Sequence, residues 1–386
     1  MKGKGSILLR MKIIVAPDKF KGSLSSFEAC NSIAAGIRLS CPDCTVESFP
    51  MADGGDGFAV VMKHYLQTET VYCSAVDPLG RTIPARYEWR AADKTAIIEL
   101  AVASGLVLLS PSERNPLKTS TYGTGLLIKD ALQKGATKII LGLGGSATND
   151  AGAGILTALG FTLKDAGGVI LEGRGEDLML VHTIVPPPVL PAIDFHIACD
   201  VDNPLYGPQG AAFIYAPQKG ASRQQVEQLD KGLRHFAHIV EAQTGRQTAA
   251  IPGAGAAGGI AVALIAYFNA TLAAGTGMVI EASGIKNSLP GAGLIITGEG
   301  KIDAQTKAGK LPAHIAELAA AYHIPVTGLC GMLDLDEKGV KELGLNYAAE
   351  IMDRSLGIEV NMQQAAELLM KKAAAIVASH SLASGE

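Results

Sequence analysis

One glycine-rich loop in the sequence combines backbone amides with small polar side chains. It follows the apolar run KIILG, reads GLGGSATND and precedes the apolar segment AGAGILTALG. A glycine loop that leads into a helix presents backbone N–H groups and the positive end of the helix dipole, which suits a phosphate group. The candidate ligands are Gly144, Gly145, Ser146 and Thr148 for phosphate, with Asn149 as a further side-chain donor, and Asp150 for a cation. Helix capping, with glycines for close packing, is the structural alternative.

Two further loops place acidic side chains directly after apolar strands. Asp53 and Asp56 stand among three glycines in DGGDG, where a ligand could approach the backbone closely. Asp200 and Asn203 follow the run FHIAC in CDVDN. Carboxylate and amide oxygens are preferred Mg²⁺ ligands, and a carboxylate can also accept a proton from a hydroxyl group. Ordinary acidic turns, including an Asx turn before Pro204, are the structural alternative.

Two lysine-bearing loops also follow apolar strands. One of them, TGEGKID, comes after LIIT, and the other, PDKFKGS, comes after KIIVA. Their candidate side chains are Glu299, Lys301, Asp303 and Lys310 in the first loop and Lys19 and Lys21 in the second. Carboxylates beside lysines suit a Mg²⁺–phosphate group, because lysine neutralises the charge of a phosphoryl group in transfer. Solvated surface loops with salt bridges are the alternative.

Taken together, glycines, acids and lysines after separate apolar strands predict a transferase that uses a Mg²⁺–nucleotide. A rival function comes from Gly142-x-Gly144-x-x-Ala147, which also fits the dinucleotide fingerprint of an NAD-dependent oxidoreductase. That match is weak, because Asp165 lies in a KDAGG turn rather than at the end of a second strand. The patterns GxxxxGK[ST], GxSxG and HExxH do not occur.

The spacing of apolar residues predicts alternating strands and helices at both ends of the chain. The predicted strands cover residues 12–16, 45–50, 294–297 and 326–330, and the predicted helices cover residues 27–39, 58–65, 312–322 and 363–378. This alternation is typical of a parallel sheet. Between residues 70 and 101, three strand-like runs follow one another with only short turns, which predicts antiparallel pairing.

The rest of the middle segment returns to a mixed pattern. It contains predicted helices at residues 123–134, 223–244 and 258–274 and predicted strands at residues 138–142 and 195–200. We therefore expect an α/β fold with two domains. A discontinuous first domain would cover residues 11–80 plus 290–386, and an inserted mixed α/β domain would cover residues 81–289. Residues 1–10 precede a second methionine and are expected to form an N-terminal extension.

Composition excludes several classes of function. The chain has 386 residues, 33 basic and 37 acidic, and a net charge of −4, so nucleic acid is not an expected partner. The uncharged stretch at residues 247–280 is long enough to span a membrane, but its glycines and alanines favour a buried helix. Six scattered cysteines predict reduced thiols in a cytoplasmic protein. The lone Cys41-Pro-Asp-Cys44 predicts a surface turn, with a redox or metal role as the alternative.

Six motifs in series resemble those of one known family. They are KIIVAPDKFKGSLS, MADGGDG, DPLGR, LGLGGSATNDAGAG, CDVDNPLYGPQGA and TGEGKIDAQT. In this order they look like the type-1 glycerate kinases, over nearly the whole chain from residue 11 onward. The resemblance implies phosphorylation of D-glycerate with ATP and Mg²⁺, in bacterial members usually on the 2-hydroxyl to give 2-phosphoglycerate. It also implies a flavodoxin-like domain built from both chain ends, a second α/β domain, and an active site in the cleft.

Within that resemblance, residue chemistry and loop position suggest a role for each candidate. We expect Asp200 to be the general base, with Asp56 as the alternative, and Lys301 to act beside it in catalysis. Glu299, Asp303 and Asp150 are the candidates for Mg²⁺. Gly144, Gly145, Ser146, Thr148 and Lys310 would contact ATP, and Lys19, Lys21, Asp53, Asp56, Arg81 and Asn203 would contact glycerate. A 3-phosphoglycerate product remains open, and so does the oligomeric state, for which a homodimer is one possibility.

Overall fold

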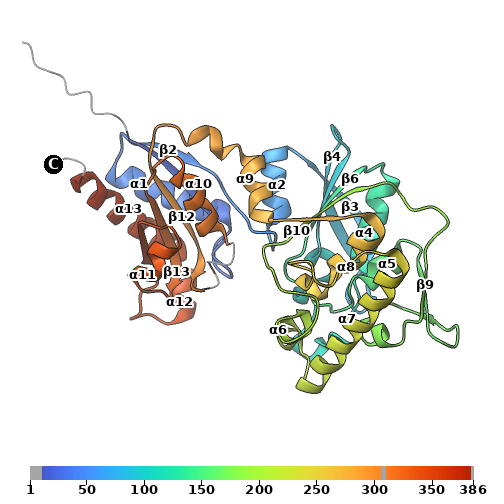
Figure 1. The fold of residues 1–386 in the computed structure, drawn as a ribbon. Coiled ribbons are helices and arrows are strands. Elements are labelled where there is room, and N and C mark those ends of the chain that lie inside the picture. The colour runs from blue at the N-terminus through green and yellow to red at the C-terminus, as the bar shows by residue number, and fades with distance from the viewer. Residues whose placement is uncertain (1–10, 305, 307–309, 384–386) are drawn as a thin grey trace, which may run out of the picture. The chain divides into compact units, whose positions relative to one another are not determined.

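The computed structural model describes residues 11–304, 306 and 310–383, without the side chains of residues 380–383, so the predicted extension at residues 1–10 lies outside the description. The chain forms two compact units (Figure 1). The first contains the residues up to Asp53 together with those from Val279 onward, and the second runs from Gly54 to Met278. The sequence prediction placed these boundaries near residues 80 and 290, whereas the structure groups residues 54–80 with the inserted unit.

The first unit is built on a five-stranded parallel sheet with the order β14-β13-β12-β1-β2. Its strands are β1 (Lys12–Pro17), β2 (Thr45–Ser48), β12 (Ala292–Ile302), β13 (Val326–Leu333) and β14 (Tyr347–Glu350). Counted within the unit, this order is 2-1-3-4-5, which is the flavodoxin-like order. The helices of the unit are α1 (Ser26–Ser40), α10 (Leu311–Ala320), α11 (Glu337–Glu342), α12 (Ile358–Gln363) and α13 (Ala365–Ala383).

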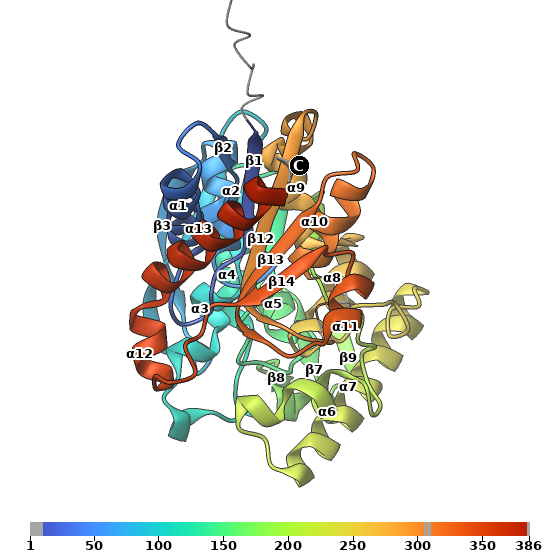
Figure 2. The same cartoon turned by 90° about the vertical axis from the view of Figure 1, so that its left-hand side faces the viewer.

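The central strands of this sheet are apolar on both faces because helices cover both. Ile13 and Val15 share one core with residues of α1 and α13, such as Ile33 and Leu369. Figure 2 shows α1 and α13 side by side on one side of the sheet and α10 on the other. Strands buried on both faces are typical of parallel sheets, and the continuous apolar runs of β1 and β12 follow from that burial.

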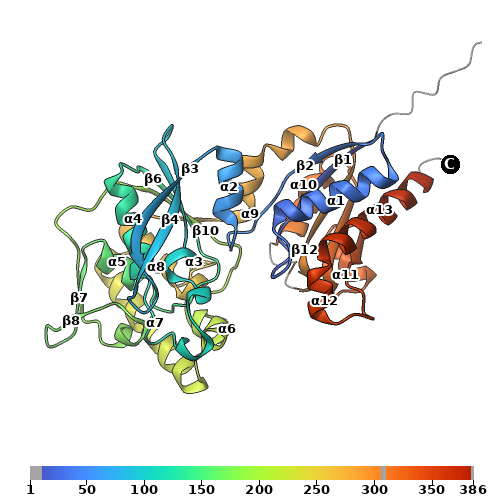
Figure 3. The same ribbon diagram turned by 180° about the vertical axis from the view of Figure 1, so that it is seen from behind.

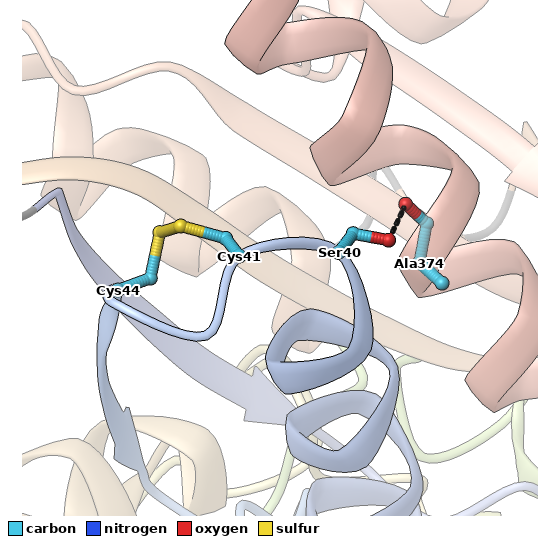
Figure 4. Close-up of a disulfide and its surroundings, with 4 residues drawn as sticks. All are labelled: Ser40, Cys41, Cys44 and Ala374. Carbon is cyan, nitrogen blue, oxygen red and sulfur yellow. Dashed lines mark hydrogen bonds between the residues drawn. A yellow bond between two sulfur atoms is a disulfide. The ribbon is translucent and has the colours of Figure 1, made fainter.

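The end of α1 carries a feature that corrects the expectation of reduced thiols. Cys41 and Cys44 form a disulfide across the turn that leads into β2, with their Cα atoms 5.4 Å apart (Figure 4). A four-residue turn brings two cysteines to this separation, which lies in the range that a disulfide requires. Beside the disulfide, Ser40 Oγ donates a hydrogen bond to the carbonyl oxygen of Ala374 and links α1 to α13. The other four cysteines are free thiols.

The second unit is built on a mixed six-stranded sheet with the order β11-β10-β6-β5-β4-β3. Its strands are β3 (Glu69–Val76), β4 (Thr82–Arg90), β5 (Thr95–Glu99), β6 (Lys138–Gly142), β10 (Asp194–Ala198) and β11 (Thr271–Ala273). Strands β3, β4 and β5 pair antiparallel as the short turns predicted, and Figure 3 shows β3 and β4 side by side. Strands β5, β6, β10 and β11 pair in parallel.

The helices of the second unit surround a separate core. They are α2 (Phe58–Leu66), α3 (Ala101–Ser104), α4 (Tyr122–Gln133), α5 (Ala153–Ala158), α6 (Ala211–Tyr215), α7 (Arg223–Thr244) and α8 (Ile260–Phe268), and α9 (Gly275–Ser283) crosses the unit boundary. A small second sheet contains β7 (Thr162–Lys164), β8 (Ile170–Leu171) and β9 (Thr183–Val185). The apolar core of the unit draws on the large sheet, α4, α7 and α8.

The predicted helix at residues 258–274 is wrong in its extent. Helix α8 ends at Phe268, and Asn269 adopts a left-handed conformation with a φ of 55°. The chain then enters β11. Asparagine tolerates this conformation better than most residues, so it ends helices much as glycine does. In the described part of the chain, no helix is both long and apolar enough to cross a membrane.

Candidate functional site

In the first unit, acids and lysines gather where β1 and β12 end. The strand order reverses between these two strands, and open α/β sheets bind ligands at the carboxyl ends of the strands at such a switch point. Asp18 follows β1, and its backbone N–H donates to the Gly298 carbonyl at 2.8 Å. Lys19 Nζ lies 3.1 Å from Asp53 Oδ1 and 3.6 Å from Asp18 Oδ1. Two predicted residues, Lys19 and Asp53, are therefore brought together.

The TGEGKID segment, predicted as a loop after a strand that ends at residue 297, continues β12 as far as Ile302 and joins the same cluster. Lys310 Nζ lies 3.3 Å from Glu299 Oε2 and 3.8 Å from Asp303 Oδ1. Thr306 Oγ1 donates to Glu299 Oε1 at 2.9 Å. Burial raises the pKa of Glu299, and the attraction of Lys310 opposes this shift. Three predicted residues, Glu299, Asp303 and Lys310, therefore form one ion-paired group.

Asp18 is the most deeply buried carboxylate of this group, with 6% of its surface exposed. Burial raises its pKa to about 7, and the nearby charges of Asp53 and Glu299 add to the shift while Lys19 opposes it. A carboxyl group with a pKa near neutrality can change its protonation state at working pH. The sequence analysis placed Asp18 in a candidate loop without giving it a role.

Two other lysines near these loops differ in their surroundings. Lys301, predicted to act in catalysis, is half exposed and pairs with Asp334 at 3.0 Å and with Asp303 at 3.4 Å. Hydrogen bonds to these two carboxylates raise the pKa of Lys301. Lys21 is exposed and lines an apolar pocket of about 170 Å³ together with Phe20 and Gly300.

In the second unit, four parallel strands end in one row. Glu99, Gly142, Ala198 and Ala273 are neighbours in register across β5, β6, β10 and β11. The loops that follow these strands therefore emerge at one edge of the sheet. These are the glycine loop after β6, the CDVDN loop after β10 and the turn before α9, and they contain most of the residues predicted for the inserted segment.

Asp200 links the CDVDN loop to two backbone amides at this edge. Its Oδ2 accepts a hydrogen bond from the Gly54 N–H at 2.7 Å, and its Oδ1 accepts one from the Thr276 N–H at 3.2 Å. The Thr276 amide belongs to the first turn of α9, where the helix dipole favours a negative charge. These bonds fix the orientation of the Asp200 carboxylate.

The DGGDG and GLGGS loops touch through their glycines. A Cβ atom on Gly144 would lie 2.2 Å from Gly55 Cα, so no larger residue fits there without backbone movement. The Gly144 N–H donates to the Gly54 carbonyl at 3.3 Å. A Cβ atom on Gly145 would lie 2.6 Å from Asp56 Oδ1, so Asp56 and the predicted phosphate loop are neighbours.

Glu99 is an acidic residue of this edge that the sequence analysis missed. Its Oε1 accepts a hydrogen bond from the Ala59 N–H at 2.7 Å. Burial raises the pKa of Glu99, and the negative charge of Asp56 adds to the shift. The signal was present in the sequence, because Glu99 stands at the end of the apolar run TAIIE. The other candidate acids likewise stand at or after the ends of apolar runs.

The later part of the glycine loop turns into the protein interior. Ser146 is 8% exposed, and Thr148 and Asp150 are fully buried. The Asp150 carboxylate accepts hydrogen bonds from Thr121, Gly152 and Gly154. These donors occupy the Asp150 carboxylate, which is fully buried within the second unit. This geometry favours a structural role for Asp150, and its predicted role as a cation ligand stays untested.

Two predicted glycerate contacts have other partners in the structure. Arg81 is half exposed, and its guanidinium group pairs with Asp77 and Glu113 at 2.5 Å. Asn203 Nδ2 donates to the Gln209 carbonyl at 2.8 Å, and its Oδ1 accepts a hydrogen bond from the Tyr215 hydroxyl at 2.5 Å. Arg81 therefore links its turn to the loop of Glu113, and Asn203 stabilises its own loop; the predicted contacts of both residues with substrate stay predictions.

A magnesium ion fits only part of the predicted ligand set. Among the described residues, no three histidine, cysteine or acidic side chains form a group that could hold a metal ion. Proteins usually hold Mg²⁺ through one or two carboxylates together with substrate phosphates and water. Glu299 and Asp303, which share Lys310, can supply such a pair.

The geometry does not support the dinucleotide fingerprint at residues 142–147. In a dinucleotide site, the glycine loop opens directly into the helix that carries the pyrophosphate. Here β6 ends at Gly142, and α5 begins only at Ala153 and is 6 residues long. Asp165 lies in the turn between β7 and β8, where its backbone N–H bonds to the Val169 carbonyl.

Sequence reasoning also missed Lys219, which lies in the short helix η4 (Pro217–Lys219). Only 1% of its surface is exposed, and Nζ donates to the Thr148 carbonyl at 2.7 Å. No spacing rule marks a lysine in PQKG as buried, since burial of this charge depends on loops that are distant in the sequence.

Comparison with known proteins gives consistent matches over nearly the whole chain. A sequence model of the Glycerate kinase family matches residues 13–381. The chain is 43% identical to a glycerate kinase of Halalkalibacterium halodurans, over 94% of this chain and 96% of that protein. It is 41% identical to a glycerate 2-kinase of Escherichia coli, over 89% of this chain and 91% of that protein. The crystal structure described as that of a glycerate kinase 2 from Salmonella typhimurium LT2 superimposes with a TM-score of 0.82 at 37% identity, covering 97% of this chain and 100% of that one.

Proposed function

The chain belongs to the glycerate kinase family, and from this premise we propose that it transfers the γ-phosphoryl group of ATP to the 2-hydroxyl group of D-glycerate. The products would be 2-phosphoglycerate and ADP. The observation that carries the proposal is the gathering of glycine, acid and lysine loops at the carboxyl ends of parallel strands in each unit. The name of the Escherichia coli relative, glycerate 2-kinase, supports the position of the phosphorylated hydroxyl.

Phosphoryl transfer needs positioning of the two substrates, neutralisation of charge and acceptance of the hydroxyl proton. Asp200 is the proposed general base, because two backbone N–H groups hold its carboxylate at the strand edge. Asp56 beside Gly145 is the alternative base. Lys301 and Lys310 would neutralise the negative charge of the phosphoryl group during transfer, and Lys310 is also proposed to contact ATP.

The proposed substrate contacts follow the loops. The amides of Gly144 and Gly145 and the side chains of Ser146 and Thr148 are proposed for the phosphates of ATP. Lys19, Lys21, Asp53, Asp56, Arg81 and Asn203 are proposed for glycerate. Glu299 and Asp303 are the carboxylates that would hold Mg²⁺, which would offset the negative charge of the phosphate groups.

The test is ³¹P NMR of a reaction that contains the protein, ATP, Mg²⁺ and D-glycerate. A signal from 2-phosphoglycerate supports both transfer and position, whereas a signal from 3-phosphoglycerate retains the kinase and overturns the position. A reaction without D-glycerate is the control, since it separates transfer from hydrolysis of ATP. Absence of any phosphoglycerate with the folded protein would contradict the proposal.

A further inference from the structure

Three loops of the second unit bring together buried polar side chains that lack hydrogen-bond partners. Thr148 and Asn149, in the loop after β6, are both 0% exposed. In the described part of the chain, Thr148 Oγ1 and both polar atoms of the Asn149 side chain have no hydrogen-bond partner. Buried polar atoms in native proteins are normally satisfied by the protein, by water or by a ligand, so these atoms indicate a missing partner.

Lys219 meets this loop from η4 with most of its hydrogen-bonding capacity unused. The Thr148 carbonyl, 2.7 Å away, is the single acceptor for Nζ among the described residues. A lysine ammonium group has three N–H donors. Burial lowers the pKa of Lys219 to about 7, although the charge of Asp150 opposes the shift.

The third loop contributes Arg114, which follows η2 (Pro111–Glu113). Its Nε atom is also buried and has no hydrogen-bond partner within the described chain. A Cβ atom on Gly220 would lie 2.2 Å from the Arg114 carbonyl oxygen, so the Arg114 loop packs directly against the residue after Lys219. The loops that carry Arg114, Asn149 and Lys219 are therefore in contact.

The unused groups around Lys219 are mainly hydrogen-bond donors, which favours an anion over a water molecule as the missing partner. The charged group that acts on Lys219 is the Asp150 carboxylate. The Asp150 oxygens already accept four hydrogen bonds. Helix α6, which packs on η4, has no charged residue, and its Tyr215 hydroxyl donates to Asn203. Lys219, Asn149 and Arg114 therefore leave N–H donors without an acceptor, and the oxygens of an oxyanion can supply the acceptors.

The backbone beside these side chains is strained. Ala151 and Ala257 both adopt a left-handed conformation with a φ of 51°, which L-residues other than glycine, asparagine and aspartate rarely adopt. The Ala151 N–H donates to the Gly258 carbonyl, so the two strained residues lie at the same junction of loops. Strain of this kind concentrates at functional sites.

We propose that Lys219, Asn149 and Thr148 form a seat for an oxyanion, with Arg114 at its edge. The identity of the oxyanion rests on the proposed function, in which it is the carboxylate of D-glycerate or a phosphate group of the nucleotide. In the first case the seat takes the part proposed above for Lys19 and Lys21. In the second it extends the phosphate contacts of Gly145 and Ser146.

Titration calorimetry with the full chain tests the seat without any need for turnover. D-glycerate and sulfate, which stands for phosphate, are titrated at pH 8 in two buffers of different ionisation enthalpy. Pairing with an anion protonates Lys219, so binding takes up about one proton from the buffer. In Lys219→Met the affinity falls about tenfold or more and the proton uptake disappears, because the charge is gone. Lys118→Met is the matched control, since Lys118 is an exposed lysine of the Arg114 loop that pairs with Glu176.

Each outcome decides between the alternatives. Proton uptake with D-glycerate assigns the seat to the carboxylate, and uptake with sulfate assigns it to phosphate. Equal binding by wild type and Lys219→Met, or binding without proton uptake, overturns the seat and leaves buried water as its occupant. If Lys219→Met does not fold, Asn149→Asp replaces it, since a carboxylate in place of the Asn149 amide repels an anion. Phosphoryl transfer by the wild type is measured separately, so a failed function and a failed seat are distinguishable.

Discussion

Single carboxylates at the two strand edges are held in different ways. Asp200 accepts hydrogen bonds from the backbone amides of Gly54 and Thr276, which fixes its orientation. Asp18 is buried beside Asp53 and Glu299, which raises its pKa to about 7. The Asp200 carboxylate is therefore held by hydrogen-bond donors, whereas the Asp18 carboxyl group can change its charge near neutral pH.

Replacement of Asp200 by asparagine tests its proposed role as the base. In Asp200→Asn, kcat should fall by about 10²-fold or more, because the amide cannot accept the hydroxyl proton. The variant should lose only about 1–3 kcal/mol of unfolding free energy, since one of the two backbone N–H groups loses its acceptor. Steady-state kinetics and urea unfolding measure the two effects. Asp202→Asn, an exposed change in the same loop, is the control, and a kcat within a few-fold of wild type would move the role to Asp56.

The raised pKa of Asp18 predicts a pH dependence of stability. Between about pH 4 and pH 7 the folded protein keeps a proton on Asp18 that the unfolded chain has released. The contribution of Asp18 to the unfolding free energy therefore decreases as the pH rises through this window. Asp18→Asn removes this contribution, so its stability should fall less between pH 5 and pH 8. Denaturant unfolding at both pH values measures the difference, and equal pH slopes would show that Asp18 ionises normally.

At the scale of residues, the sequence identified the loops that carry the candidate site better than it identified the contacts of single residues in them. Apolar strands followed by glycine and acid located Lys19, Asp53, Glu299, Lys310 and Asp200, which the structure places at two strand edges. The sequence could not reveal that Arg81 forms ion pairs with Asp77 and Glu113, because these contacts depend on how a hairpin turn packs against a distant loop. Burial of Lys219 has the same origin.

At the scale of elements, glycines decide which loops can touch. Gly144 and Gly55 approach so closely that a Cβ atom on Gly144 would lie 2.2 Å from Gly55 Cα. This contact aligns the DGGDG loop with the GLGGS loop, which is the predicted phosphate loop. The regular elements that support these loops were predictable, and α7 and β6 have the predicted bounds. Helix α8 was not, because the left-handed turn at Asn269 interrupts a continuous apolar pattern.

Gly144→Ala should separate the two loops. We expect a loss of about 1–3 kcal/mol in unfolding free energy, because the added methyl group meets backbone atoms that cannot rotate away. Transfer activity should also fall. Gly167→Ala is the matched control, since the nearest atom to its Cβ would lie 3.4 Å away and its φ is not positive. Equal unfolding curves for the two variants would contradict the predicted clash.

The disulfide between Cys41 and Cys44 should stabilise the first unit modestly. A cross-link over four residues removes little freedom from the unfolded chain, and the chain-entropy estimate is roughly 2 kcal/mol. Replacement of both cysteines by serine should therefore lower the unfolding free energy by up to about this amount. Denaturant unfolding with and without a reductant measures it. If the reductant lowers the unfolding free energy of the serine variant as much as that of the wild type, the disulfide is not the source of the stabilisation.

At the scale of the whole molecule, the two units have separate apolar cores. The buried residues in the core of the second unit lie between Ala75 and Ala270, with Val71, Cys73 and Leu272 packed against them, whereas the core of the first unit draws on both ends of the chain. One unit is therefore continuous in sequence and the other is not.

This difference predicts that a fragment of residues 54–278 folds on its own. Its sheet and its core are complete without the rest of the chain. The expected result is a cooperative thermal unfolding transition, followed by circular dichroism. A fragment of residues 11–53 should show no such transition, because β1 then lacks β12. Gradual, noncooperative melting of the longer fragment would contradict the prediction.

The pairing of β1 with β12 also determines how late the sheet of the first unit can form during synthesis. β1 leaves the ribosome early, but its neighbour β12 follows only after the entire inserted unit has been made. At about 5–20 residues per second, the apolar strand KIIVA waits for tens of seconds with one edge unpaired. A nascent chain with such an edge is a natural client for chaperones that hold extended apolar segments until translation ends.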